Sequence, residues 1–372
     1  MRTEDLDRLL HVLAELDGSD LHLKAGSPPR IRVDGALGAL ENERRFTAED
    51  TGDLADAIIP QQLRQVFEDQ HEADFAYGVA GLGRFRVNAF LQRGSVALAI
   101  RRVRTQAATI ADLGLPEVVR RLAEEQRGLV LVTGPTGSGK TTTLAAIIDH
   151  INHTRSCHVI TIEDPIEYLH RDDLAAVDQR EIGFDTETFT SAMRVVLRQD
   201  PDVILIGEMR DQETIYTALT AAETGHLVFS TLHTTTATET VNRVVDMFPS
   251  HQQGQIRVSL AAALKGTICQ RLIPRADGRG RAPAVEVMVV NGRVQQAIID
   301  PLQTSDIDQI MTDGDYYGMQ TFDQALAGLI ANGTISIRDA MQAASNPHDL
   351  KVMLERRGLM HSGRGFVAAT GA

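Results

Sequence analysis

The chain is 372 residues long, carries a formal net charge of −13, and contains two cysteines, Cys157 and Cys269. This length predicts two or three domains with enough residues to bury a core. The acidic balance argues against a protein that coats nucleic acid, although it is compatible with a local basic channel. Two cysteines so far apart, with no C-x-x-C pair, argue against a disulfide framework and a structural zinc site, and they fit a reducing compartment.

The sequence shows no pattern for entering a membrane. The first residues, MRTEDLDRLLHVLAEL, are amphipathic and lack the basic start and apolar run of a signal peptide. No apolar stretch approaches the roughly 18 residues that span a bilayer. We therefore expect a cytoplasmic protein that works at a membrane only through a partner.

Residues 1–103 predict a mixed α+β domain. Leucines at helical spacing predict a first helix that ends at Gly18, and a second helix is expected over 48–69. These leucines are Leu6, Leu9, Leu10, Leu13 and Leu16. Alternating residues predict the strands 19–23, 31–33, 74–77, 83–93 and 96–103. A hairpin turn is expected at Asp34-Gly35.

Arginines gather at the end of this domain, at Arg84, Arg86, Arg93, Arg101, Arg102 and Arg104. Since strand residues alternate between faces, Arg84 and Arg86 share one face. Charged side chains of this kind can form a solvated edge that discourages edge pairing. The alternative is that one or two arginines reach a nucleotide held by another domain. The sequence leaves both interpretations open.

A linker over 104–116 leads into a second domain, 117–299, in which strands and helices alternate. Apolar runs predict the strands 129–132, 159–162, 203–206 and 227–230, and helices fit at 188–198, 212–223 and 236–247. This alternation is typical of an α/β fold with a mainly parallel sheet. Helices dominate over 300–357. The tail, 358–372, is too poor in large apolar residues to order itself.

The most specific signal is the glycine loop 134–141, which fits G-x-x-x-x-G-K-[ST] between a predicted strand and helix. Its glycines let backbone N–H groups surround a phosphate, and the helix N-terminus adds partial positive charge. Lys140 suits the β- and γ-phosphates of ATP, and Thr141 suits Mg²⁺. The predicted nucleotide-binding residues are Gly134, Pro135, Thr136, Gly137, Ser138, Gly139, Lys140, Thr141 and Thr142.

Carboxylates follow two of the predicted strands. Glu163 and Asp164 come at the end of one strand, and Glu208 follows another. Because ligands of open α/β sheets bind outside the carboxyl ends of the strands, these acids are candidates to hold Mg²⁺ or to accept a proton from the attacking water. Arg210 and Asp211, next along the chain, suit a structural pair.

Two histidines flank the strand predicted at 227–230. His233 stands at its carboxyl end, where it is placed to sense the γ-phosphate. His226 stands about one strand length away, roughly 20 Å at ~3.3 Å per residue. The two are therefore not expected to touch the same atom, and His226 serves either a neighbouring subunit or the fold alone.

These segments together resemble the secretion-type hexameric ATPases of type II secretion and type IV pili. ITIEDPIEY at 160–168 resembles their Asp box, GEMRD at 207–211 their atypical Walker B, and TGHLVFSTLHT at 224–234 their His box. SDLHLKAGSPPRIRVDG at 19–35 and GMQTFDQAL at 318–326 are similar to the PilT/PilU retraction ATPases of twitching motility. Extension ATPases normally carry a tetracysteine zinc insertion, which two isolated cysteines do not provide.

The resemblance implies a RecA-like P-loop NTPase domain preceded by a PAS-like N-terminal domain and followed by a helical C-terminal segment. It implies a homohexamer that hydrolyses ATP with Mg²⁺ and powers type IV pilus retraction. Such a motor works at the cytoplasmic face of the inner membrane through a pilus platform protein, with no membrane insertion and no nucleic-acid partner. Glu163 would orient the water, and Thr141 and Glu208 would hold Mg²⁺. Arg84 and Arg101 lead the candidates for phosphate contacts from the N-terminal domain.

One segment departs from the retraction pattern. Where those ATPases carry an Ala-Ile-Arg-rich signature, this chain has Asp300-Pro301 within the stretch 297–303. The ATPase assignment does not depend on this segment. The alternatives are a motor of the same family for pilus assembly, type II secretion or DNA uptake, and a RecA-like nucleic-acid translocase. Aromatic residues are 4 % of the chain and tryptophan is absent, which disfavours the stacking surfaces of a translocase.

Overall fold

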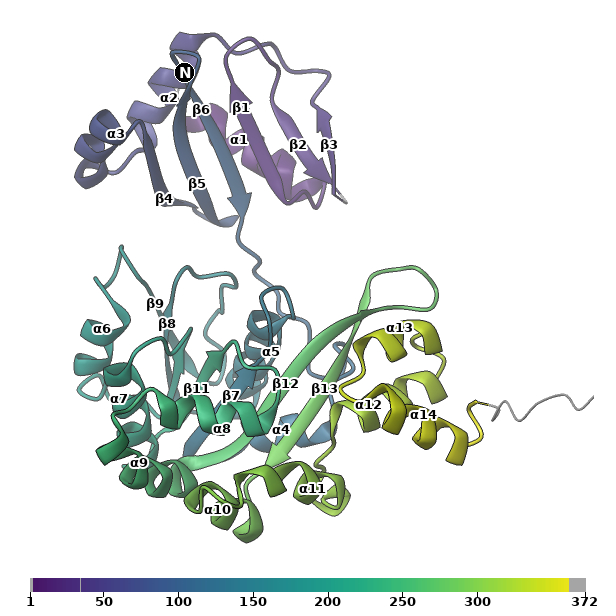
Figure 1. The fold of residues 1–372 in the computed structure, drawn as a ribbon. Coiled ribbons are helices and arrows are strands. Elements are labelled where there is room, and N and C mark those ends of the chain that lie inside the picture. The colour runs from purple at the N-terminus through teal and green to yellow at the C-terminus, as the bar shows by residue number, and fades with distance from the viewer. Residues whose placement is uncertain (1–2, 34, 361–372) are drawn as a thin grey trace, which may run out of the picture. The chain divides into compact units, whose positions relative to one another are not determined.

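A computed structural model describes residues 3–33 and 35–360 (Figure 1). Asp34 of the expected hairpin turn lies outside the described residues, as do residues 361–372 of the expected tail. Within the described part, no helix is both long and apolar enough to cross a membrane. The described residues form two compact units, one within 1–106 and 166–171, the other within 107–165 and 172–360.

The first unit contains a six-stranded antiparallel sheet in the order β3-β2-β1-β6-β5-β4. Its strands are β1 (Asp20–Lys24), β2 (Arg30–Val33), β3 (Ala36–Ala39), β4 (Glu72–Val79), β5 (Gly83–Gln92) and β6 (Ser95–Arg102). The apolar face packs against α1 (Thr3–Glu15) and α2 (Ala48–Ile58). Successive strand residues point to opposite sides, and the other face, called the polar face below, carries the charged and polar residues Asp20, His22, Lys24, Arg86 and Asn88 together with Ala97, Ala99 and Phe90.

The prediction of a single helix over 48–69 is wrong. Helix α2 ends at Ile58, and a 3₁₀ turn (Gln61–Leu63) and α3 (Arg64–Gln70) follow Pro60. Proline lacks an N–H group and disfavours helical geometry in the residue before it. Ile59 is accordingly extended, with φ −65° and ψ 122°.

The second unit contains a seven-stranded sheet in the order β13-β12-β7-β11-β10-β8-β9. Every neighbouring pair is parallel except β12 with β13. The predicted α/β class with a mainly parallel sheet is therefore confirmed. The strands are β7 (Gly128–Thr133), β8 (His158–Glu163), β9 (Ala176–Glu181), β10 (Val203–Ile206), β11 (Leu227–Leu232), β12 (Leu264–Pro274) and β13 (Arg281–Val289).

Helices cover both faces of this sheet (Figure 1). Leu129 and Leu131 of β7 join one apolar core, and Val130 and Val132 join the other. Such two-sided burial makes a central strand a continuous apolar run. The helices are α4 (Glu117–Ala123), α5 (Lys140–Thr154), α6 (Phe189–Val196), α7 (Gln212–Glu223), α8 (Ala237–Asp246), α9 (Ser250–Ala263), α10 (Gly292–Ile299), α11 (Ile307–Thr312), α12 (Phe322–Ala331), α13 (Ile337–Ala343) and α14 (Pro347–Arg356).

Candidate functional site

The carboxyl ends of four neighbouring strands bring the predicted site residues of the second unit to one edge of its sheet. Strands β7, β11, β10 and β8 lie side by side in this order and end nearly level with one another. Gly134 follows β7, His233 follows β11 and Glu208 comes just after β10, while Glu163 ends β8. The parallel register therefore gathers a glycine loop, an imidazole and two carboxylates along one edge.

The phosphate loop connects β7 to α5 and depends on glycine conformations. Gly134, Gly137 and Gly139 have φ angles of 142°, 79° and 91°, which residues with a Cβ rarely adopt. Gly139 is the N-cap of α5, and no side chain caps this helix. The first N–H groups of α5 therefore end in the loop without a side-chain acceptor, as an anion-binding helix terminus requires.

Lys140 folds back over this loop. Its Nζ donates to the carbonyl oxygens of Gly134, at 2.8 Å, and Pro135, at 3.3 Å. Burial lowers the pKa of Lys140, and the negative charge of Glu208 opposes this effect. Charged phosphate oxygens are stronger acceptors than these two carbonyls, so the ammonium group is well placed to exchange them for a nucleotide.

The loop offers donors that fit a nucleotide and its metal ion. Ser138 is buried, and its Oγ has no hydrogen-bond partner within the described residues. Thr141 and Thr142, in the first turn of α5, are partly exposed. Residues 3–33 and 35–360 contain no group of three His, Cys, Asp or Glu side chains suited to a metal. This donor set fits a Mg²⁺ ion held mostly by phosphate oxygens and water.

Glu208 is held between Arg210 and His233. Its Oε2 lies 2.8 Å from Arg210 Nη2, and its Oε1 lies 3.0 Å from His233 Nε2. Burial works to raise the pKa of Glu208, but the hydrogen bond and charge of Arg210, together with His233, outweigh burial and lower it. Asp211 has a separate partner, because it caps α7 and accepts from the backbone N–H of Thr214 at 2.8 Å.

Glu163 is buried at the end of β8. Its Oε1 accepts hydrogen bonds from Thr161 Oγ1, at 2.6 Å, and Gln179 Nε2, at 3.1 Å. Gly207 comes so close that a Cβ on it would lie 3.4 Å from the Cα of Glu163. The ends of β8 and β10 are therefore close together, and Glu163 has a fixed position, whereas the neighbouring Asp164 is exposed.

The sequence patterns do not identify two glutamines that lie near the site. Gln179 lies on β9, an edge strand of polar sequence whose residues show no apolar alternation. Gln270 lies on β12, beside the phosphate loop, and its Oε1 accepts from Thr143 Oγ1 at 2.7 Å. One sequence signal indicates Gln270, because it is a lone amide side chain within a mostly apolar stretch. A buried amide of this kind needs a hydrogen-bond partner.

His226 lies at the opposite end of β11 from His233. Its Nδ1 is 2.9 Å from the carbonyl oxygen of Ala221 and 3.4 Å from Thr224 Oγ1. These contacts join the end of α7 to the start of β11. The sequence leaves two roles open for His226, one toward a neighbouring subunit and one in the fold. These contacts support the role in the fold.

The arginines of the first unit divide between the two faces of its sheet. Arg84 and Arg86 occupy alternate positions of β5, and Arg101 of β6 pairs directly with Arg86, so the three share the polar face. Arg101 is 67 % exposed, and its Nε donates to Asp20 Oδ1 at 2.8 Å. Arg102, the next residue, belongs to the opposite face.

The segment 166–171 belongs to the first unit, although Glu163 lies just before it in the chain. Ile166 and Tyr168 are buried there. Arg104 Nη1 donates to the Tyr168 hydroxyl at 3.2 Å, and the Leu169 N–H donates to the carbonyl oxygen of Arg104 at 2.8 Å. Arg104 therefore has a structural partner within its own unit.

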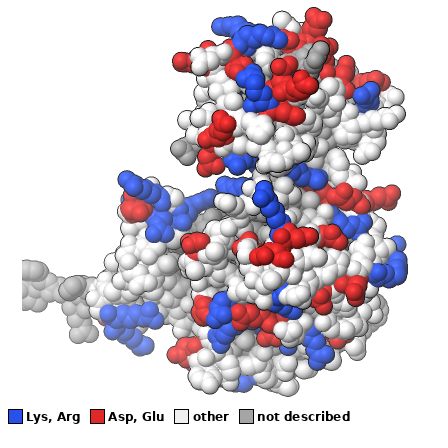
Figure 2. Space-filling model, turned by 180° about the vertical axis from the view of Figure 1, so that it is seen from behind, with Lys and Arg blue, Asp and Glu red and all other residues white. Residues whose placement is uncertain are grey.

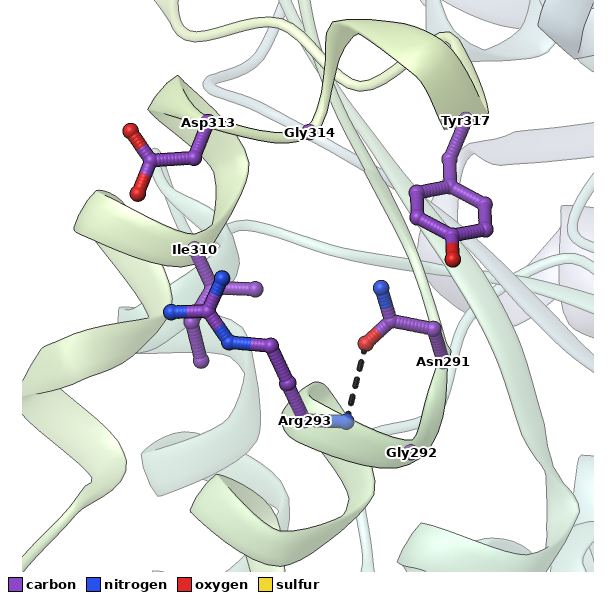
Figure 3. A pocket seen from close by; sticks show the side chains of 7 residues that line it. All are labelled: Asn291, Gly292, Arg293, Ile310, Asp313, Gly314 and Tyr317. Carbon is purple, nitrogen blue, oxygen red and sulfur yellow. Dashed lines mark hydrogen bonds between the residues drawn. The ribbon is translucent and has the colours of Figure 1, made fainter.

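Other concavities of the second unit lie away from the phosphate loop. One of about 520 Å³ is formed beside the start of α10, where Asn291 Oδ1 accepts from the backbone N–H of Arg293 at 3.0 Å and Tyr317 lies on the side opposite Asp313 (Figure 3). A larger one, of about 820 Å³, is lined by Glu286 and Asp323 among others. None of the predicted site residues lines either of them.

A glycine loop, its lysine and two strand-end carboxylates at one edge of a parallel sheet define a P-loop nucleoside triphosphatase. The family described as Type II/IV secretion system protein matches residues 44–346. The chain belongs to this family, as its motifs predicted.

The relatives of this chain include ATPases of type IV pili. The chain is 45 % identical to the type IV pilus retraction ATPase PilT of Pseudomonas aeruginosa, over 93 % of this chain and 99 % of that protein. It is 40 % identical to the type IV pilus ATPase PilU of the same organism, over 94 % and 91 %. The crystal structure of the pilus retraction motor PilT with bound ADP matches with a TM-score of 0.84 and 47 % identity, over 93 % and 99 %.

Proposed function

We propose that this chain is the ATP-hydrolysing motor of type IV pilus retraction. The observation that carries the proposal is one edge of the second unit's sheet, where the loop with Lys140 follows β7, Glu208 follows β10 and Glu163 ends β8. The match to pilus retraction ATPases over nearly the whole chain supports the choice of machine.

Each group at this edge has a part in the proposed reaction. Lys140 binds the β- and γ-phosphates, and Thr141 and Glu208 hold Mg²⁺. Glu163 orients the attacking water, and its hydrogen bonds hold the carboxylate at one position. His233 acts through Glu208, which it contacts at 3.0 Å.

The proposed motor is a ring of six identical chains. Its parts are the PAS-like domain, 1–103, the linker, 104–116, the motor domain, 117–299, and the helical segment, 300–357. Arg84 and Arg101 contact phosphate from the N-terminal domain. Each unit, taken by itself, carries both acidic and basic side chains on the face seen in Figure 2. Together with the formal net charge of −13, this disfavours a nucleic-acid partner. We place the ring at the cytoplasmic face of the inner membrane, on a pilus platform protein.

The activity is tested with purified protein. Lys140→Ala is expected to lose Mg²⁺-dependent ATP turnover, because the variant lacks the charge that stabilises the transferred phosphoryl group. Phosphate release is measured, with circular dichroism to check folding. Turnover at the parent rate in a folded Lys140→Ala protein would overturn the ATPase proposal.

A second candidate is a motor of the same family for pilus assembly or secretion. The observation that favours it is the altered signature segment, where α10 ends at Ile299 and Asp300-Pro301 follow. Deleting the gene in its own organism distinguishes the machines. Cells that keep surface pili but no longer retract them support retraction, whereas loss of pili supports assembly, and retained pilus function with lost export supports secretion.

A further inference from the structure

The phosphate loop packs against one residue of β12. Strand β12 runs parallel to β7 with Cys269 opposite Thr133, so Gln270 lies level with the start of the loop. A Cβ on Gly134 would overlap the carbonyl oxygen of Gln270, and a Cβ on Gly139 would lie 2.8 Å from its side-chain nitrogen. Both fixed glycines of the loop, at its start and at its end, therefore need their small size at contacts with Gln270.

The Gln270 side chain is buried, with 3 % exposed, and has a defined orientation. Its Oε1 accepts from Thr143 Oγ1 at 2.7 Å, and the backbone N–H of Thr143 donates to the Gly139 carbonyl oxygen at 3.0 Å. Because the amide oxygen faces Thr143, the amide nitrogen is turned toward Gly139. One side chain thus links the end of the glycine loop to the first turn of α5.

We propose that Gln270 is a positioning residue for nucleotide binding, which holds the loop from Gly134 to Gly139 in the shape that accepts phosphates. Lys140 and Thr141 begin the same helix turn that Thr143 ends, so a shift of this turn displaces both groups from their ligands. Misplacement by about 1 Å can cost on the order of 100-fold in rate. A neutral amide accepts and donates hydrogen bonds without placing a charge beside the phosphates.

Three substitutions and one control separate the loss of the hydrogen bond between Gln270 and Thr143 from the effect of a charge beside the phosphates. Gln270→Leu removes the hydrogen bond and keeps an apolar volume, and Thr143→Val removes the same bond from the other side. Gln270→Glu keeps the shape but introduces a carboxyl group that repels phosphate when it is ionised. Thr267→Val is the matched control. Thr267 is buried on the same strand, β12, and pairs with Leu131 of β7, before the phosphate loop begins.

The measurements are the dissociation constant for Mg²⁺–ADP, the KM and kcat for ATP, and the melting temperature without nucleotide. Gln270→Leu and Thr143→Val are expected to raise the dissociation constant and KM about tenfold or more, and to lower kcat as well, by up to on the order of 100-fold. Thr267→Val is expected to bind as the parent does. Gln270→Glu is expected to bind ADP more weakly as the pH rises and to recover at acidic pH, when the carboxyl group is protonated.

This inference rests on the proposed ATPase function, and the experiment tells their failures apart. A parent protein that binds no ADP contradicts the proposed function. Parent-like ADP binding in folded Gln270→Leu and Thr143→Val, with a parent protein that does bind, overturns the inference alone. If Gln270→Leu fails to fold, Thr143→Val decides the question. A pH-independent affinity in Gln270→Glu also contradicts a position beside the phosphates.

Discussion

Glu208 Oε1 lies 3.0 Å from His233 Nε2, and the two residues follow the ends of adjacent parallel strands, β10 and β11. Thr231 Oγ1 also donates to the carbonyl oxygen of Gly207, at 2.6 Å, which fixes the backbone just before Glu208. The end of β11 therefore orients the acid that follows β10 in two ways, through an imidazole and through a hydroxyl.

From this contact we predict that His233→Ala slows hydrolysis while nucleotide binding is kept. Partners that orient a metal ligand typically contribute about 10- to 100-fold to activity, and a fall of that size in kcat is expected. His226→Ala is the matched control, since His226 lies at the far end of the same strand and contacts Ala221. Steady-state turnover and ADP titration check the prediction. Equal losses in both variants would mean that His233 supports only the fold.

Glu163→Gln is expected to bind ATP and hydrolyse it slowly. A positioned general base contributes about 10² to 10⁴ in rate, whereas glutamine keeps the size of the side chain. The control is Glu167→Gln, which changes an exposed acid of the same stretch. Single-turnover measurements of phosphate release separate chemistry from product release. An unchanged rate in Glu163→Gln would move the role to Glu208, or to Glu167 if Glu167→Gln is the slow variant.

The parts of the site that the sequence predicted are those with a local signal. Lys140 lies in a motif of fixed spacing, and Glu163 and Glu208 follow apolar runs long enough to be recognised as buried strands. The sheet rule then places both acids at the carboxyl edge without knowledge of the strand order.

The parts that could not be predicted depend on contacts between distant segments. The polar residues of β9 are stabilised by pairing with β8, although they lack the alternation of a half-buried strand. Gln270 contacts the phosphate loop only because β12 pairs with β7. These two strands are far apart in the sequence, because β8 to β11 and their helices lie between them in the chain. The sequence also does not predict that the segment 166–171 belongs to the first unit, because this depends on the place at which Tyr168 is buried.

A pH dependence is expected from Glu286, away from the phosphate loop. Burial raises the pKa of Glu286 to about 7, Asp308 adds to this effect, and the N–H of Ala237 and the charge of Arg271 oppose it. A raised pKa means that the folded chain binds this proton more tightly than the unfolded chain does. The stabilisation is present at pH values below the ordinary pKa and is lost as the pH rises through about 7.

We therefore predict that Glu286→Gln, which keeps an acceptor for Ala237, raises the melting temperature relative to the parent at pH 8 but not at pH 5. The difference corresponds to at most about 3 kcal/mol, at about 1.4 kcal/mol per pKa unit. Asp313→Asn, a change at an exposed acid, serves as the control. A shift that is the same at both pH values would contradict a buried carboxyl group with a raised pKa.

The polar face of the first unit's sheet gives a prediction about neighbouring residues. Arg101→Ala and Arg84→Ala are expected to lower kcat without unfolding the protein, because an arginine supplied to phosphate can be worth about 10³ to 10⁵ in rate. Arg102→Ala is the control, since Arg102 is adjacent in sequence but lies on the other face and pairs with Asp17 at 3.2 Å. Parent-like turnover in all three variants would assign these arginines to a solvated surface.

The last prediction is that these arginines act between chains of the ring. Turnover per chain should rise steeply with protein concentration as rings form, if the arginine of one chain completes the site of another. Lys140→Ala keeps its arginines and lacks a working phosphate loop, whereas Arg84→Ala keeps the loop and lacks one arginine. Mixed rings of these two inactive chains should regain part of the activity, because some sites then combine an intact loop with an intact arginine. Subunit exchange is followed by energy transfer between labelled chains, and exchange without any recovered turnover would place the arginine and the loop of each working site in the same chain.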